Sequence, residues 1–168
     1  MTGSAVFSPC RTWRYSLSRI WNASARPAMF IGLNPSTADE TQDDPTIRRC
    51  VAFAKAWGYG GLTMGNIFAY RATKPDDMVN QGRERAVGPD NDQALLDGAE
   101  AAGIVVCAWG NWGRWFQRQD EVVQMMRAAN RPLYYLKLTG DGSPGHPLRL
   151  KSSLKPQLWA ASMPICAR

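Results

Sequence analysis

The chain has 168 residues, of which 45% are hydrophobic and 20% charged; this composition is ordinary for one globular domain and excludes a disordered chain. Lys and Arg outnumber Asp and Glu by 20 to 14, and the formal charge of +6 favours an anionic partner, most commonly nucleic acid. No apolar run approaches the ~20 residues of a membrane span and the amino terminus lacks a signal-peptide core, so we expect a single domain over residues 1–168, in the cytoplasm and without a membrane partner.

The first third of the chain predicts two strands and a helix. The stretch from Arg11 to Trp21 alternates polar and large residues, which indicates an antiparallel strand or hairpin element. The run from Ala28 to Leu33 is apolar without alternation, as in a strand covered on both faces. Asp44, which is followed by proline, is a natural helix N-cap, and apolar residues at helical spacing carry that helix to Gly58 or Gly60.

The rest of the chain continues the alternation of strands and helices. We predict in order a strand at Leu62 to Tyr70, a helix from Asp90 or Asp92 through Ala102, a strand at Ile104 to Trp109, a helix at Trp115 to Ala129, a strand at Pro132 to Leu138 and a short helix near Leu154 to Ala160. Such alternation predicts parallel strands with right-handed crossovers. The fold class is therefore α/β: a three-layer α/β/α sandwich around a central, mainly parallel four-stranded sheet, plus an N-terminal antiparallel element.

Polar or glycine-rich segments follow each of the four predicted parallel strands. They are Asn34, Asn66, the segment Gly110 to Gly113 and the loop Gly140 to Leu150. Carboxyl ends of parallel strands meet at one edge of a sheet, and ligands of α/β proteins bind just beyond them. The sequence therefore predicts one binding site at this edge.

Each candidate residue also has a purely structural interpretation. Asn34 precedes a proline and could simply start a turn. Asn66 lies in an apolar strand, where its amide needs either backbone partners or a ligand. His146 lies in a Gly/Pro-rich loop and could be solvated. Three tryptophans could stack on nucleic-acid bases or could pack in the core or at the rim of the site: Trp109, Trp112 and Trp115.

We expect neither a metal nor a cofactor. No C-x-x-C motif is present, and the wide spacing of the four cysteines favours free thiols, at Cys10, Cys50, Cys107 and Cys166. Asp43 and Asp44 could suggest a metal ligand pair, but capping of a helix accounts for Asp44. The single histidine, His146, excludes chemistry that needs two imidazoles in one subunit.

Several strings resemble known families. GLNPSTAD, DDPTIRRC, WGYG and GNIFAYRATKP, with RYSL upstream, resemble an uncharacterised family of bacterial and phage proteins, a domain of unknown function. The order of motifs is more distantly similar to the uracil-DNA glycosylase superfamily: GLNPS resembles its first motif, GNIFAYRA its second-strand segment, VVCAWGNWG its third strand and GHPLRL its closing H-P-S-P-L-S motif. The distant resemblance implies a uracil-DNA glycosylase-like fold and a hydrolase that cleaves the N-glycosidic bond of uracil or a related modified pyrimidine.

The resemblance also implies roles for individual residues. Asn34 would orient the attacking water, although a neutral amide is no strong base. Asn66 would hydrogen-bond the edge of a flipped pyrimidine, and His146 would stabilise negative charge on the departing base. Leu148 would enter the duplex as an apolar wedge. Further residues would surround the base (Gly32, Leu33, Pro35, Ser36 and Phe68) or contact DNA (Arg149, Lys151 and Arg71).

Two departures from the glycosylase pattern leave alternatives open. HPLRL lacks the serines of H-P-S-P-L-S, and the loop after Asn34 is acidic. An enzyme of nucleotide or modified-base metabolism with the same pocket is therefore the second hypothesis. A catalytically silent nucleic-acid-binding module is the third. In each case we expect a monomer whose partner is DNA, a nucleotide or a nucleobase.

Overall fold

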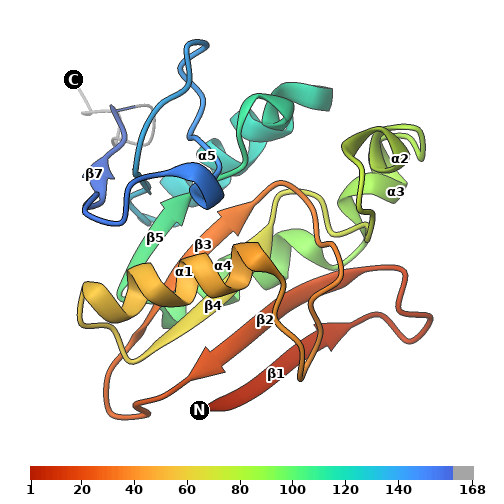
Figure 1. The fold of residues 1–168 in the computed structure, drawn as a ribbon. Helices are drawn as coiled ribbons and strands as arrows, with labels where there is room; N and C mark the ends of the chain where they lie inside the picture. The colour runs from red at the N-terminus through yellow and green to blue at the C-terminus, as the bar shows by residue number, and fades with distance from the viewer. Residues whose placement is uncertain (161–168) are drawn as a thin grey trace.

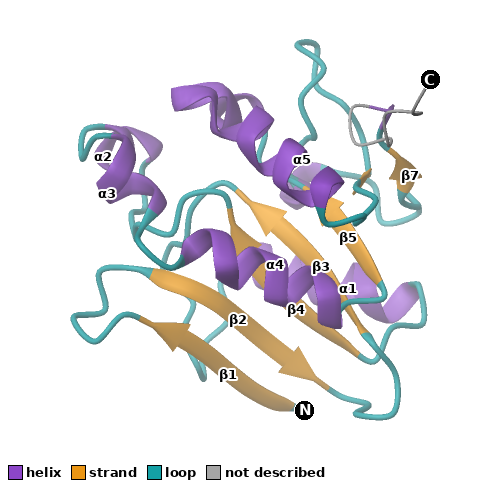
Figure 2. Cartoon of the chain, turned by 180° about the vertical axis from the view of Figure 1, so that it is seen from behind, coloured by secondary structure: helices purple, strands orange, loops and turns teal. Residues whose placement is uncertain are grey.

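The structure is a computed structural model in which residues 1–160 are described. A mixed sheet of seven strands lies at the centre, with helices on both faces (Figures 1 and 2). The strands are ordered along the sheet as β1 (Thr2–Phe7), β2 (Arg14–Ile20), β4 (Gly61–Asn66), β3 (Pro27–Gly32), β5 (Ile104–Cys107), β6 (Tyr134–Tyr135) and β7 (Gln157–Leu158). The α/β class is therefore confirmed, and Cys166 lies outside the described residues.

The prediction of a four-stranded sheet is wrong, because the sheet has seven strands and is mixed. β4, β3, β5 and β6 do pair in parallel, but β2 joins β4 antiparallel, β1 joins β2 antiparallel, and β7 joins β6 antiparallel. The predicted N-terminal antiparallel element is β2, which is part of the same sheet. The mixed topology leaves the carboxyl ends of the parallel strands at one edge, where the chain turns into its connecting loops.

Helix α1 (Pro45–Ala56) begins where the sequence predicts. The Asp44 carboxylate accepts a hydrogen bond from the Ile47 N–H at 2.8 Å, which caps the first turn. The helix ends at Trp57, and Gly58 follows with a φ of 82°, a left-handed conformation that glycine adopts without strain. The start of α1 is thereby fixed beside the end of β3.

The other elements depart from the predictions mainly at their ends. α4 (Asn91–Ala101) agrees, whereas α5 (Arg118–Ala128) begins after a 3₁₀ segment, η1 (Asn111–Gln117). Two short helices, α2 (Pro75–Val79) and α3 (Arg83–Val87), and the 3₁₀ turn η2 (Pro147–Arg149) were not predicted.

The helix predicted near Leu154 to Ala160 is wrong. Pro156 cannot donate a helical hydrogen bond, and the residues that follow it pair with β6 as the short strand β7. The strand predicted from Leu62 to Tyr70 ends at Asn66 instead. Beyond Asn66 the backbone donates to carbonyls of the β3 loop and of α3, so the regular ladder stops there.

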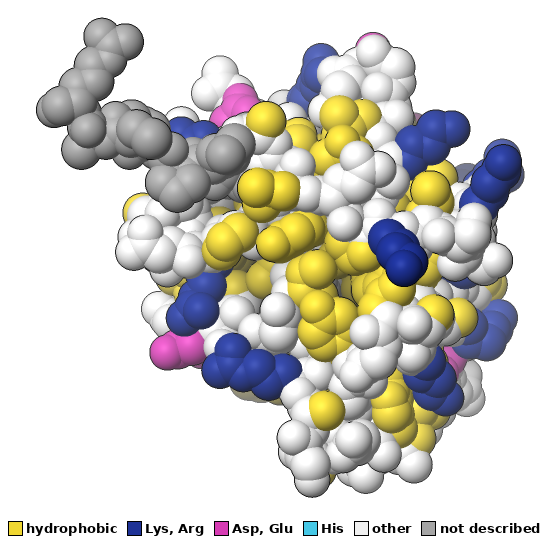
Figure 3. All heavy atoms as spheres, turned by 90° about the vertical axis from the view of Figure 1, so that its left-hand side faces the viewer, with side chains coloured by type: hydrophobic (Ala, Val, Ile, Leu, Met, Phe, Trp, Pro, Cys, Tyr) yellow, Lys and Arg dark blue, Asp and Glu magenta, His cyan; other side chains and the backbone are white. Residues whose placement is uncertain are grey.

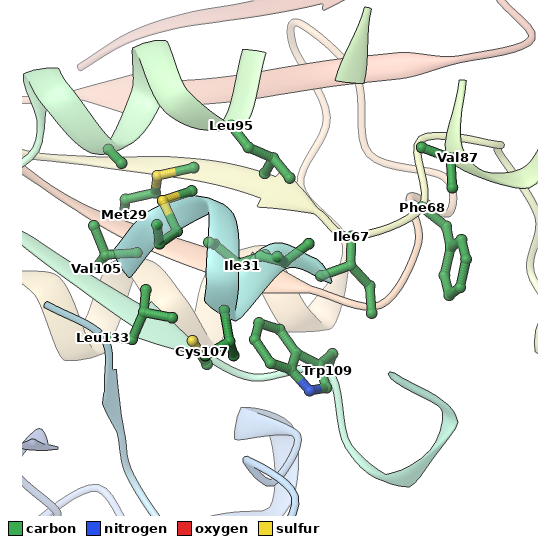
Figure 4. Packing of buried hydrophobic residues seen from close by; sticks show 14 of the residues in the cluster. Met29, Ile31, Ile67, Phe68, Val87, Leu95, Val105, Cys107, Trp109 and Leu133 are labelled. Atoms are coloured by element: carbon green, nitrogen blue, oxygen red, sulfur yellow. The ribbon is translucent and has the colours of Figure 1, made fainter. Parts of the chain in front are cut away.

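The core has two halves, one on each face of the sheet. Along β3, Ala28 and Phe30 pack with α1, whereas Met29 and Ile31 pack against the α4 and α5 side. Figure 4 shows this second half, with Ile31 between Leu95 and Trp109 and Met29 beside Val105. Burial on both faces explains why this strand lacks alternation in the sequence.

Basic side chains surround apolar ones on one face of the molecule (Figure 3). The face drawn in Figure 3, on the side of β7, shows hydrophobic side chains between Lys and Arg, with fewer acidic side chains. Within residues 1–160, no helix has both the length and the apolar character required to cross a membrane.

Candidate functional site

A cavity of about 380 Å³ lies at the carboxyl ends of β3 and β4, against the start of α1. This volume falls within the range of about 300–1,000 Å³ that is usual for small-ligand pockets. Six of the residues predicted from the sequence line this one cavity, namely Gly32, Leu33, Asn34, Ser36, Asn66 and His146. Segments far apart in the chain therefore converge here.

Asn34 follows β3 and is half-buried in the cavity wall. Its amide nitrogen Nδ2 donates to the Ala72 carbonyl at 2.8 Å and to the Pro35 carbonyl at 3.2 Å. Its Oδ1 has no hydrogen-bond partner among residues 1–160. The backbone therefore fixes the amide orientation and leaves Oδ1 as a free acceptor in the cavity wall.

Asn66 is the last residue of β4 and is 2% exposed. Its Oδ1 accepts from Arg14 Nη2 at 3.4 Å, and no partner for its Nδ2 occurs in the described part of the chain. Asn66 stands opposite Gly32 in the parallel ladder. A Cβ at position 32 would lie 2.9 Å from Asn66 Nδ2 and 2.7 Å from Met64 Cε, so glycine is needed there to leave room for the amide.

His146 is exposed at the cavity rim, just before η2. Its Nδ1 accepts from the Leu148 N–H at 3.3 Å, which assigns the proton of the neutral imidazole to Nε2. Desolvation lowers the pKa of His146 below its usual value, and the negative charge of Asp44 opposes this shift. At neutral pH the ring is therefore an uncharged Nε2–H donor.

Two further charged residues line the cavity and were missed as site residues. Arg14, on β2, is 2% exposed, and desolvation lowers its pKa to about 10, so it keeps its charge at neutral pH. Asp44 caps α1 with Oδ1 and also lines the cavity. The RYSL string contains Arg14, but only the fold shows that the side chain is buried. For Asp44, helix capping is a sufficient explanation at the sequence level, so the sequence gives no sign that the residue also lines the cavity.

Other predicted residues lie outside the cavity. Phe68 is fully buried in the core, where it packs edge-on against Phe116, and Pro35 is buried without lining the cavity. Arg71 lines a separate, open hollow of about 570 Å³ that shares Ser36, Ala72 and Thr73 with the cavity. The three remaining predicted DNA contacts are exposed around η2: Leu148, Arg149 and Lys151.

The three tryptophans divide between core and rim. Trp109 is 2% exposed, and its indole donates to Gln119 at 2.8 Å. Trp112 and Trp115 are 37% and 45% exposed and stack on each other with centroids 5.6 Å apart. Trp112 and Trp109 line the cavity, so an exposed aromatic pair borders the site.

The acidic loop between β3 and α1 uses its charges internally. Asp43 pairs with buried Arg19 at 2.8 Å, and Glu40 pairs with Arg11 at 2.9 Å. Asp39 accepts from two backbone N–H groups of its own loop, and these bonds lower its pKa. The loop therefore presents less free negative charge to a ligand than its sequence implies.

The described residues contain no group of three or more His, Cys, Asp and Glu that could hold a metal. Cys10, Cys50 and Cys107 are free. Burial raises the pKa of Cys50 and of Cys107, whereas hydrogen bonds with Ser8 and Thr12 lower the pKa of exposed Cys10 to about 7.

The fold and this cavity define an α/β protein with a cavity, lined by several polar side chains, at the carboxyl ends of parallel strands. Residues 14–148 match the family described as protein of unknown function (DUF1643), and the chain belongs to this family. No curated protein and no solved structure matches the chain. The first resemblance is thereby confirmed, while the comparisons provide no link to uracil-DNA glycosylases.

Proposed function

We propose that the protein is a glycosylase-like hydrolase that cleaves the N-glycosidic bond of uracil or a related modified pyrimidine in DNA. One geometric fact carries this proposal: one partly open cavity gathers the amides of Asn34 and Asn66, the carboxylate of Asp44 and the imidazole of His146. Asn34 offers a hydrogen-bond acceptor for water, and Asp44 offers a base. Asn66 and His146 offer hydrogen-bond donors to the oxygens of a pyrimidine ring.

In the proposed reaction, water attacks C1′ of the sugar as the C1′–N bond breaks. The electron pair of that bond passes to the base, and the water proton passes to the carboxylate of Asp44. Asn34 Oδ1, the free acceptor, orients the water. His146 donates from Nε2 to a base oxygen and stabilises the charge that develops there, an effect typically worth a factor of about 10²–10³ for one donor.

Asn66 selects the base. Because Arg14 contacts Oδ1, the amide presents Nδ2 as a donor without a partner in residues 1–160. A ring carbonyl satisfies that donor, whereas the exocyclic amino group of cytosine would oppose one donor with another. A pyrimidine with carbonyl oxygens on its reading edge is therefore the favoured ligand.

A free nucleotide is the second candidate substrate, favoured by the hollow beside the cavity. That hollow carries three arginines, Arg11, Arg71 and Arg85, and shares a wall with the cavity. The guanidinium of Arg71 has a buried Nε without a partner in the described residues. A phosphate in the hollow with its base in the cavity satisfies this charge for either a nucleotide or a DNA strand.

The test uses end-labelled DNA that carries uracil, hydroxymethyluracil or mismatched thymine, followed by alkaline cleavage at abasic sites. We expect cleavage at one of these bases, and loss of cleavage in Asp44→Asn. A parallel incubation with deoxyuridine monophosphate, read as free uracil by chromatography, identifies a nucleotide hydrolase. If the protein binds DNA in a salt-dependent manner but releases no base from either substrate, the proposed activity is refuted, and the protein is a catalytically silent nucleic-acid-binding module.

A further inference from the structure

Arg14 is a buried cation that has no ion pair within residues 1–160. It lies on β2, is 2% exposed and lines the cavity, yet forms no ion pair with the described carboxylates. Burying an uncompensated charge is expensive, and such groups are normally paired. Nearby Arg19 and Arg71 add positive charge, and Asp44 provides the opposing negative charge in the cavity wall.

Most of the hydrogen-bonding capacity of Arg14 is unused. Nη1 donates to the Ala38 carbonyl at 2.9 Å, and Nη2 donates to Asn66 Oδ1 at a long 3.4 Å. Nε is buried and has no partner in the described part of the chain. A guanidinium has five N–H donors, so the residues described leave three of them unsatisfied. The contrast with buried Arg19 is direct, because that side chain pairs with Asp43 at 2.8 Å.

The surrounding groups do not supply the missing acceptor. Asn66 offers Nδ2, which is another donor, on the same wall as Arg14. The free acceptor Oδ1 of Asn34 and the carboxylate of Asp44 belong to the loop after β3 and to the start of α1. The wall formed by β2 and β4 is therefore cationic and rich in donors.

We propose that Arg14 forms an anion-binding subsite beside Asn66, so that the ligand carries a carboxylate or phosphate oxygen pair next to the ring carbonyl that Asn66 binds. A planar guanidinium suits such a group, because it can give two parallel N–H···O bonds. This inference rests on the proposed function, for which it defines the substrate class as a modified pyrimidine that carries an anionic group on its ring.

The experiment measures binding by calorimetry with three probes: uracil, 5-carboxyuracil and inorganic phosphate. The wild-type protein is compared with Arg14→Met, which removes the charge, and with Arg14→Lys, which keeps the charge but cannot give two parallel N–H···O bonds. Arg26→Met is the matched control, since Arg26 precedes β3 at the opposite end of the strand from Gly32. Circular dichroism checks that each variant is folded.

We expect 5-carboxyuracil to bind about tenfold or more tightly than uracil, because hydrogen bonds between charged groups are roughly twice as strong as neutral ones. Arg14→Met should abolish the difference, Arg14→Lys should reduce it, and Arg26→Met should retain it. Phosphate that displaces 5-carboxyuracil identifies a subsite open to phosphate, and phosphate that fails to do so identifies one shaped for a carboxylate on the ring.

Equal wild-type affinity for uracil and 5-carboxyuracil, no binding of any probe, or a preference that persists in Arg14→Met overturns the inference. If Arg14→Met does not fold, the wild-type comparison and Arg14→Lys decide. If uracil is released from DNA but the protein shows no preference for an anionic ligand, the proposed function holds and the anion-binding subsite is refuted. If anion binding depends on Arg14 but no base is released, the subsite holds and the proposed function is refuted.

Discussion

Substitution of Asp44 separates two roles that this carboxylate has in the structure. One oxygen caps α1 through the bond to Ile47 N–H at 2.8 Å, and the residue also lines the cavity. Asparagine can accept the same capping bond but carries no charge, whereas alanine can do neither. Asp44→Ala should therefore cost about 1 kcal/mol of unfolding free energy, and Asp44→Asn only a few tenths.

These costs correspond to a measurable difference in thermal stability. For a domain of this length, about 1 kcal/mol lowers Tm by about 2–4 °C. We expect that shift for Asp44→Ala and a smaller one for Asp44→Asn by scanning calorimetry. Base release should fall in both variants alike, by about 10²–10⁴ if the carboxylate accepts the proton of the attacking water. Activity and stability should thus be uncoupled in Asp44→Asn.

A third readout is the pKa of His146, the only histidine in the chain, whose imidazole signal can be followed by proton NMR without assignment. The Asp44 charge raises the pKa of His146 against the effect of desolvation, so Asp44→Asn should lower this pKa further. An Asp44→Asn protein that is fully active, with an unchanged His146 pKa, would show that Asp44 is only a helix cap.

Three further predictions concern other walls of the cavity. Gly32→Ala places a Cβ 2.9 Å from Asn66 Nδ2, so discrimination between uracil and cytosine in excision assays should fall; an unchanged ratio would contradict the packing argument. Because the pKa of His146 is lowered on folding, the unfolded chain binds the proton more readily, and stability in urea should decline as pH falls below about 6.5. His146→Gln should lose less stability over that range, and an equal loss in both proteins would refute this assignment. Trp112 is exposed, so Trp112→Ala should weaken binding of single-stranded DNA with little change in Tm; unchanged affinity would leave the aromatic pair without a role in stacking.

The elements that the sequence predicts well are those fixed by local chemistry. Asp44 and the proline after it define the start of α1 because capping involves only neighbouring residues. The run from Ala28 to Leu33 predicts a strand buried on both faces, and β3 is such a strand. Both signals lie within a few residues of the feature that they specify.

Features that depend on distant pairing could not be predicted in this way. β6 is only Tyr134–Tyr135, because its limits are set by the few residues of β5 and β7 that reach it. The motif that contains Phe68 predicts contact with a ligand, but the turn after β4 directs this side chain into the core. Arg14 occupies a polar position of a strand in the sequence, and it is buried in the fold, where it donates to Ala38 in the loop after β3 and to Asn66 on β4.

The same long-range pairing explains why a structural and a chemical interpretation of Asn34 are compatible. Beyond the last ladder pair, the chain after β4 continues to donate to the chain after β3, from Ile67 to Gly32 and from Phe68 to Leu33, both at 2.9 Å. The Asn34 amide closes this contact by donating to the Ala72 carbonyl at 2.8 Å. Because Nδ2 is used in this contact between the two loops, Oδ1 is left as an acceptor in a fixed position, without a partner among residues 1–160. An aspartate would provide oxygens but no donor, so only the amide both builds this wall and offers an acceptor from it.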